Sequence, residues 1–289
     1  MRKFDLIEPK SLAEACALLG NHPDAKAVAG GTALLTIIKQ GLLLPKLLVN
    51  LKKIIDGSAI TFDPVQGLRI GALATINEIE TSEIVNRHYP ALAEACHVVA
   101  NIRIRNMATI GGNLCHGDYQ SDPPTVLAAL DACVEVMSAA NVRQLALTDF
   151  QLGSYETALQ PGELLSAVVI PPLPAGMSGH YVKFTTGSSE ERPCAGVAAL
   201  ARIDGGVCRE LRLAVGAVSA KPSRITAEAL AKDKILTADL ITTIAAEAAR
   251  AIDPIDDVRG SADYKRHLVG VLTRRALEQL ANGKTEMKS

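Results

Sequence analysis

The sequence contains no tryptophan, and aromatic residues make up only 3% of its 289 residues. Proteins that bind single-stranded nucleic acid usually stack bases on aromatic side chains, so this scarcity argues against that class. The formal net charge is −1, which leaves no basic field to attract nucleic acid or anionic lipid. We therefore expect no nucleic-acid partner.

Long hydrophobic runs are also missing. The most apolar stretch, residues 41–47, is interrupted by Pro45 and Lys46 and is far shorter than the ~20 residues of a transmembrane helix. The N-terminal MRKFDLIEPK has basic residues with no apolar segment behind them, so it does not resemble a signal peptide. We expect a cytoplasmic protein with no transmembrane segment.

The six cysteines are scattered, with no C-x-x-C pair and no histidine at zinc spacing. Reduced thiols are the expected state in the cytosol. The sequence therefore predicts neither a metal site nor an iron–sulfur cluster on this chain.

What is present favours a globular protein: 48% of residues are hydrophobic and 21% are charged, over a length typical of about two domains. Strands at 26–29 and 47–51 flank a helix at 33–40, with Thr32 as a candidate cap. Such a strand–helix–strand unit builds a parallel sheet. Two S/T-x-x-E capping boxes, Ser11–Glu14 and Thr75–Glu78, open further helices, and Gly20 is expected to end the first.

Three prolines within residues 171–174 predict a linker that ends any regular element. Before it the pattern predicts strands at 68–73, 132–137, 144–148 and 163–170 and short helices between 75 and 100. After it we expect strands at 181–185, 194–203 and 207–215, the last two joined by an Asp204-Gly205-Gly206 turn, and then helices at 225–232, 238–252 and 262–280.

Two glycine pairs are the candidate binding features. Gly30-Gly31 lies between the first strand and its helix, and Gly111-Gly112 lies within the turn at 109–113. Glycine tolerates positive φ and close backbone approach, so consecutive N–H groups can form a nest for an anion such as pyrophosphate. The first pair is neither a G-x-G-x-x-G nor a P-loop, and a structural turn is the better interpretation of it alone. Arg103 and Arg105 precede the second; they could pair with phosphate or be ordinary surface charges.

Taken together these segments resemble the FAD-binding medium subunit of molybdenum hydroxylases, a group that includes carbon monoxide dehydrogenase and xanthine dehydrogenase-type enzymes. The resemblance spans nearly the whole chain. It rests on AGGTALL at 29–35, IRN at 104–106, TIGGNL at 109–114, the run 118–131, VRGSADYKRH at 258–267 and RRAL at 274–277.

The resemblance implies an α+β fold in three parts. An N-terminal βαβ subdomain (1–55) and a larger mixed subdomain (56–174) form a two-subdomain FAD fold of the PCMH type. A C-terminal domain (175–289) has an antiparallel sheet with a helical bundle. It also implies the FAD-binding residues: Ala29, Gly30, Gly31, Thr32, Ala33, Leu34, Arg105, Asn106, Thr109, Ile110, Gly111, Gly112, Asn113, Asp122, Tyr181 and Lys183. Tyr181 would stack near the flavin ring or simply pack on its sheet.

Two positions depart from the family pattern. Ala33 offers only its backbone where relatives often have a polar residue, and His116 beside Cys115 could in principle tether a flavin. We interpret His116 as a loop residue and Cys115 as a packed thiol. A cysteine-rich cluster loop, which some relatives insert, is not expected here.

The implied function is electron transfer without catalytic residues of the chain's own. A large molybdopterin-containing subunit and a small subunit with [2Fe-2S] clusters would be partners in a dimer of heterotrimers, and the acceptor could be a quinone, NAD or oxygen. Two alternatives are a free-standing FAD-dependent reductase and a non-enzymatic interaction protein. We further expect Gly31→Val or Gly111→Val to abolish FAD binding and leave the fold largely intact.

Overall fold

The computed structural model describes residues 3–283 and divides the chain into two compact units. Unit 1 comprises the residues up to Ile79 together with Asn101–Asp118 and Ala132–Pro171. Unit 2 comprises Glu80–Ala100, Tyr119–Asp131 and the residues from Pro172 onward. Each unit is built from segments that are distant in the sequence.

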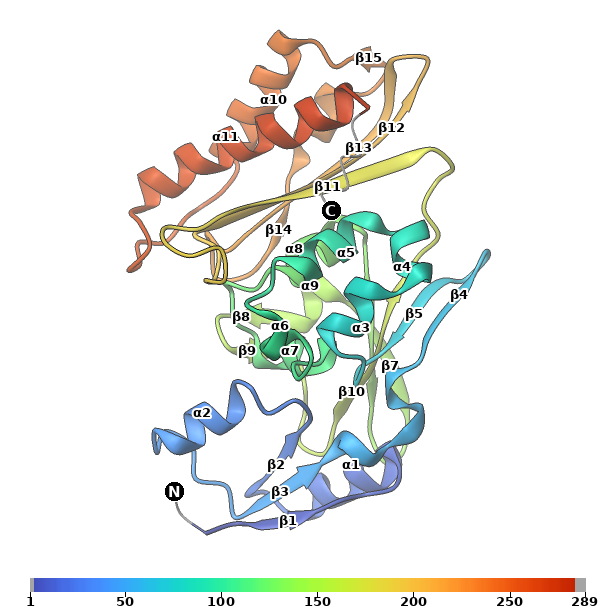
Figure 1. Ribbon diagram of the computed structural model, residues 1–289, viewed down its shortest axis with the longest axis vertical. Coiled ribbons are helices and arrows are strands. Elements are labelled where there is room, and N and C mark those ends of the chain that lie inside the picture. The colour runs from blue at the N-terminus through green and yellow to red at the C-terminus, as the bar shows by residue number, and fades with distance from the viewer. Residues whose placement is uncertain (1–2, 284–289) are drawn as a thin grey trace. The chain divides into compact units, whose positions relative to one another are not determined.

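The N-terminal part of unit 1 is a three-stranded parallel sheet (Figure 1). Its elements are β1 (Asp5–Ile7), α1 (Leu12–Asn21), β2 (Ala25–Val28), α2 (Leu34–Lys39) and β3 (Leu47–Asn50), with strand order β1-β3-β2. The predicted strand–helix–strand unit is confirmed, while β1 was not expected. Ser11 caps α1 by accepting a hydrogen bond from the Glu14 amide, and Gly20 lies inside this helix rather than at its end.

Thr32 does not cap α2, contrary to the prediction. The position before the helix is occupied by Ala33, whose backbone is already helical, and no side chain accepts from the first turn. Gly31 has φ +73°, so the chain has turned before Thr32 is reached. The first amides of α2 are therefore left without a side-chain cap.

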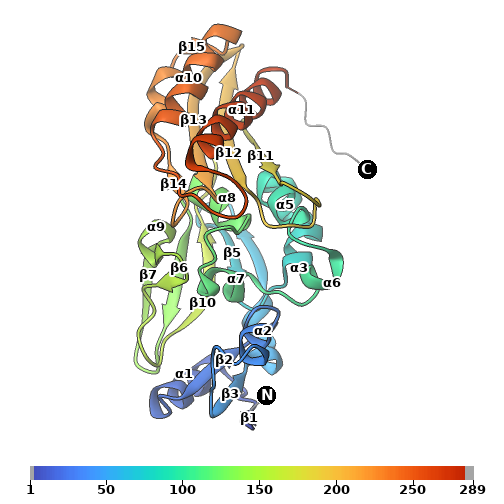
Figure 2. The same cartoon turned by 90° about the vertical axis from the view of Figure 1, so that its left-hand side faces the viewer.

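The larger sheet of unit 1 is antiparallel, as Figures 1 and 2 show. Its order is β4 (Ile60–Asp63), β5 (Gly67–Gly71), β10 (Leu164–Ile170), β6 (Cys133–Met137) and β7 (Val142–Ala146). Around it lie η1 (Leu51–Lys53), η2 (Ile55–Ser58), α3 (Ile76–Thr81), α6 (Ile102–Arg105), α7 (Ile110–His116), α9 (Leu147–Phe150), β8 (Gln151–Gly153) and β9 (Glu156–Thr157). A core of α1, β3 and Leu164 of β10 joins the two sheets.

Unit 2 is a second antiparallel sheet with two long helices on one face (Figure 1). The sheet has the order β11 (Met177–Phe184), β12 (Ala195–Asp204), β13 (Val207–Gly216) and β14 (Ser223–Arg224), and β15 (Lys234–Ile235) pairs with β13. The helices are α4 (Glu83–His88), α5 (Pro90–His97), α8 (Pro123–Ala129), α10 (Ala238–Arg250) and α11 (Ala262–Ala281).

The hairpin between β12 and β13 confirms the predicted turn. Gly205 and Gly206 both have positive φ, as a two-residue turn of type I′ requires. The helix expected at 225–232 is instead the 3-10 turn η3 (Thr226–Leu230). The mixed α and β architecture confirms the predicted fold class. The predicted domain boundaries at residues 55 and 174 stay a prediction.

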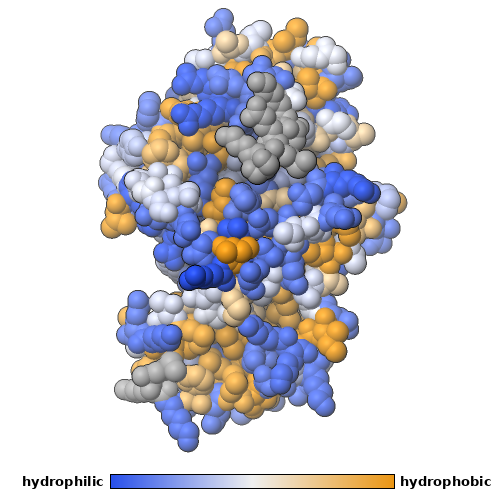
Figure 3. Space-filling view, in the orientation of Figure 1, coloured by the Kyte–Doolittle hydropathy of each residue, from blue (hydrophilic) through white to orange (hydrophobic). Residues whose placement is uncertain are grey.

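Large apolar side chains remain exposed on the N-terminal elements of unit 1, where Figure 3 shows apolar residues gathered on one face. Among residues 3–283 no helix combines the length and apolarity that crossing a membrane requires. The exposed apolar residues on these elements are Leu6, Ile7, Leu35, Leu42 and Leu44.

Candidate functional site

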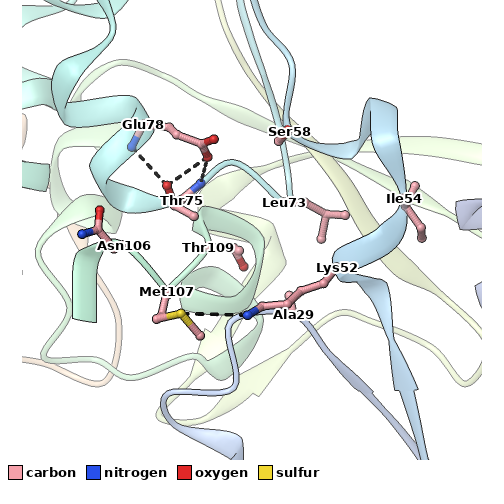
Figure 4. Close-up of a pocket in the computed structure, with 10 residues that line it drawn as sticks. All are labelled: Ala29, Lys52, Ile54, Ser58, Leu73, Thr75, Glu78, Asn106, Met107 and Thr109. Atoms are coloured by element: carbon pink, nitrogen blue, oxygen red, sulfur yellow. Dashed lines mark hydrogen bonds between the residues drawn. The ribbon is translucent and has the colours of Figure 1, made fainter. Parts of the chain in front are cut away.

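Unit 1 contains a cavity of about 270 Å³ that opens between the first glycine turn and the segment before α7 (Figure 4). Its wall combines apolar side chains with a few polar groups, as ligand pockets commonly do. Ala29, Asn106 and Thr109 were predicted from the sequence. The complete lining is Ala29, Lys52, Ile54, Ser58, Leu73, Thr75, Glu78, Asn106, Met107 and Thr109.

The first glycine pair packs against residues 107 and 108, just before the second glycine turn. A Cβ on Gly30 would lie 1.9 Å from the carbonyl oxygen of Met107, so only glycine allows the turn to pack against this backbone. Within residues 3–283, the amides of residues 30–34 donate to no acceptor. Unsatisfied N–H groups at a strand-to-helix turn favour an anionic ligand. The predicted nest is open at the first glycine pair.

The second glycine pair does not form an open nest, and this corrects the sequence-based interpretation. Residues 110–113 are the first turn of α7, and Thr109 is its cap. The amides of Ile110 and Gly111 donate to the carbonyls of Ala74 and Ala72, both at 2.9 Å. The next two amides bond to the Thr109 hydroxyl and carbonyl at 3.1 and 2.9 Å. A ligand would have to displace these bonds.

Gly111 is required for packing rather than for a positive φ. A Cβ at this position would lie 2.6 Å from the Ala72 Cβ and 2.7 Å from the Ala72 carbonyl oxygen. The expectation that Gly111→Val leaves the fold largely intact is therefore wrong, because valine would push apart α7 and the strand end that holds it. At Gly31, with φ +73°, the nearest obstacle is the flexible Leu35 side chain at 3.0 Å.

The cavity wall carries two charged side chains, and only one of them is paired. The Glu78 carboxylate accepts from the Thr75 amide (2.7 Å) and hydroxyl (2.9 Å), which confirms the predicted capping box (Figure 4). Lys52 Nζ lies 3.9 Å from Met107 Sδ, and in the described part of the chain no carboxylate is within 4.0 Å of it. Lys52 thus adds a positive charge without a carboxylate partner to the cavity that Ala29 of the glycine turn also lines.

Sequence reasoning missed Lys52, because a Lys-Lys pair after a strand looks like solvated surface. Its neighbour Lys53 does have that role, since it pairs with Glu8 at the surface. Arg105, predicted among the FAD-binding residues, is half-buried on α6 and does not line the cavity.

The other predicted residues form a buried cluster inside unit 2. The Tyr181 hydroxyl donates to Asp122 Oδ1 at 2.9 Å, and Lys183 Nζ donates to Asp122 Oδ2 at 3.1 Å and to the Val98 carbonyl at 2.8 Å. Burial raises the pKa of Asp122 to about 6, against the opposing charge of Lys183. Burial and then Asp122 also raise the pKa of Tyr181. The Tyr181 side chain is only 9% exposed, and stacking on the flavin stays a prediction for it.

This cluster predicts a pH dependence of stability. An unfolded aspartate titrates near 3.9, so folded protein binds the Asp122 proton more tightly than unfolded protein does. The resulting stabilisation is complete below pH 4 and is lost as pH rises through 6. Relative to Asp122→Asn, the free energy of unfolding should fall by up to about 3 kcal/mol between pH 4 and pH 7. Urea unfolding of both proteins at several pH values measures this, and parallel pH profiles would contradict it.

The segment after the second glycine pair is packed rather than reactive. Burial raises the pKa of the Cys115 thiol to about 12, which keeps it protonated, in agreement with its interpretation as a packed residue. His116 is the last residue of α7, not a loop residue, and its ring lies 5.2 Å from that of Tyr155. In the described residues no group of three His, Cys, Asp or Glu side chains could hold a metal ion.

The residues around the unit 1 cavity fit a phosphate-containing dinucleotide. Free amides at the glycine turn and the unpaired Lys52 both favour negative charge, and Leu73, Ile54 and Met107 offer apolar surface beside them. The cavity is smaller than a whole FAD molecule, so it would hold only part of one.

Comparison with known proteins also indicates an FAD-binding protein, and the matches cover most of the chain. Residues 2–173 match the model of the FAD binding domain in molybdopterin dehydrogenase, and residues 181–280 match that of the CO dehydrogenase flavoprotein C-terminal domain. The chain is 31% identical to the glyceraldehyde dehydrogenase medium chain of Sulfolobus acidocaldarius over 280 residues, which are 96% of this chain and 99% of that protein.

Two solved structures have the same fold as this chain. Carbon monoxide dehydrogenase from Hydrogenophaga pseudoflava is 33% identical, with a TM-score of 0.91 and 96% of each chain covered. Quinoline 2-oxidoreductase from Pseudomonas putida 86 is 31% identical, with a TM-score of 0.93 and 98% of each chain covered. The chain therefore belongs to the family of FAD-binding medium subunits of molybdenum hydroxylases, and it is an oxidoreductase subunit that binds FAD for electron transfer.

Proposed function

We propose that this chain holds FAD with its phosphates at the glycine turn of residues 29–34, and that Lys52 supplies a positive charge in the same cavity. The observation that carries the proposal is the set of amides at residues 30–34 that have no acceptor within the described chain, beside an unpaired ammonium group. Bound FAD supplies the redox chemistry, and the protein supplies position and electrostatics. Asn106 and Thr109 line the same cavity and complete its polar wall.

The remaining predicted residues shape the cavity or belong to the buried cluster of unit 2. We assign Thr109, Ile110, Gly111, Gly112 and Asn113 to shaping the cavity, because Thr109 lines it and the amides of the four residues after it already have protein partners. Asp122 and Lys183 bond to each other inside unit 2, and their role in binding the dinucleotide rests on the family resemblance.

The electrons reach this chain from partners. The similar glyceraldehyde dehydrogenase and carbon monoxide dehydrogenase chains are medium chains, and one similar solved structure is a Cu,Mo-CO dehydrogenase. We propose a large molybdopterin subunit and a small subunit with [2Fe-2S] clusters as partners, in a cytoplasmic dimer of heterotrimers. The exposed apolar residues Leu6, Ile7, Leu35, Leu42 and Leu44 of the N-terminal part support association, because soluble monomers rarely expose large contiguous apolar patches.

A spectrum of the purified chain tests flavin binding directly. We expect flavin absorption bands, or their appearance when FAD is added, and release of FAD rather than FMN on acid denaturation. Protein that stays colourless and takes up no FAD would refute the proposal. Copurification with two further chains, one containing molybdenum, would in addition reject a free-standing flavoenzyme.

Lys52→Met tests the charge beside the turn. Loss of a charge-assisted hydrogen bond to phosphate should weaken FAD binding by roughly ten-fold and reduce its dependence on salt. Titration of the apoprotein with FAD, followed by flavin fluorescence at two salt concentrations, measures both effects.

The matched control is Lys53→Met, which removes the same charge one residue away. Lys53 pairs with Glu8 and does not line the cavity, so its loss should leave FAD affinity unchanged. Equal FAD affinities for the two variants would show that Lys52 has no special role.

A further inference from the structure

A second cavity lies in unit 2, at the hairpin end of β12 and β13, and no part of the electron-transfer function uses it. It measures about 260 Å³. Two arginines from adjacent strands line it, beside the turn that leads into β11. Its lining is Ala175, Gly176, Arg202, Ile203, Asp204 and Arg209.

A β-bulge brings the two arginines to the same face of the sheet. Arg202 pairs with Glu210 and Ile203 pairs with Cys208, so Arg209 is the extra residue on β13. Cys208 and Leu211 both belong to the core under the two long helices, although an uninterrupted strand would place residues three apart on opposite faces. Arg209 therefore lies on the face away from that core, as Arg202 does. Bulges commonly redirect a side chain in this way.

Of the two arginines that line this cavity, only Arg202 has no carboxylate partner within the described residues. Glu210, directly across from Arg202, is held by Arg212 at 2.7 Å. Arg209 pairs with the exposed Asp233 at 3.0 Å. In the described part of the chain Arg202 has no carboxylate partner, and its Nε is buried without any hydrogen-bond acceptor. A buried donor without an acceptor is uncommon in native proteins and indicates a missing ligand or solvent molecule.

We propose that this cavity binds a small oxyanion, a carboxylate or phosphate group of a small molecule, held by Arg202 and Arg209. A guanidinium group presents parallel donors that match two oxygens of either group, and Arg202 has all of its donors free. Gly176 does not obstruct the cavity. A Cβ built on this residue would meet nothing within 4 Å. The site is separate from the FAD cavity, and its ligand does not depend on the flavin assignment.

Nitrogen-15 NMR of the arginine Nε–H groups in the full-length protein tests the site at a single atom. Titration with inorganic phosphate and, separately, with acetate should shift the Arg202 Nε–H signal to saturation with at least one of them. Phosphate alone would identify a phosphate site and acetate alone a carboxylate site. No saturable shift of the Arg202 signal with either anion would overturn the proposal.

Three variants make the test specific. Arg202→Met and Arg209→Met should each weaken binding of the effective anion by about ten-fold, measured by calorimetry. Arg250→Met removes an equal charge from an exposed i,i+3 pair on α10 and should leave the affinity unchanged. If Arg202→Met does not fold, Arg209→Met decides, because its side chain is 40% exposed. Wild-type affinity in a folded Arg202→Met or Arg209→Met would also overturn the proposal.

Discussion

Replacing Asp257 by alanine should lower the free energy of unfolding by about 3–5 kcal/mol, because it leaves a buried lysine without its counter-ion. Lys265 is 0% exposed, and its ammonium group donates to Asp257 Oδ2 at 2.6 Å and to the Ile255 carbonyl at 2.9 Å. Asp257 also accepts from the Tyr119 hydroxyl and the Gln120 amide. The substitution removes the centre of this network and leaves its donors unsatisfied.

Asp263→Ala is the matched control, since Asp263 forms an ion pair with Arg266 while 97% exposed. It should cost less than about 1 kcal/mol. Burial acts to raise the pKa of Asp257, but hydrogen bonds, first from Lys265, bring it below the usual value. Its stabilising contribution is therefore present above the unfolded pKa and lost as pH falls. Equal urea midpoints for the two variants at neutral pH would contradict the expectation.

Gly30→Ala should abolish FAD binding and destabilise unit 1. The added Cβ would lie 1.9 Å from the Met107 carbonyl oxygen and 2.9 Å from the Ala108 Cα, and both neighbours are backbone atoms that have little room to move. Overpacking of this kind costs about 1–3 kcal/mol or more, and it would separate the glycine turn from the cavity wall that Met107 forms. FAD titration and urea unfolding measure the two effects.

Gly41→Ala separates the effect of the clash from that of glycine itself. Gly41 has φ +76° with nothing within 4 Å of a Cβ, so the change should cost about 1 kcal/mol of backbone strain and leave FAD binding intact. A Gly30→Ala protein that bound FAD as tightly as Gly41→Ala would show that the two glycine segments need not touch.

Local elements were predictable where the pattern of apolar residues and capping residues agreed. The strand–helix–strand unit, the Thr75–Glu78 capping box and the turn at Gly205-Gly206 formed as expected, because each depends on a few neighbouring residues. The strand Asp5–Ile7 was missed, since its three residues carry too little pattern and all are exposed.

The sequence by itself determined the family and the local elements, because the glycine pairs and the capping residues act over short distances. Only the tertiary structure decided how each glycine is used. Gly31 makes the turn through its positive φ, whereas Gly30 and Gly111 leave room for backbone carbonyls of residues far along the chain. The prediction of a second amide nest was wrong for the same reason. The strand-end carbonyls of Ala72 and Ala74 accept hydrogen bonds from the N–H groups of that turn. Lys52 and the Arg202–Arg209 pair likewise depend on folding, since a charge is free or paired only once its neighbours are in place.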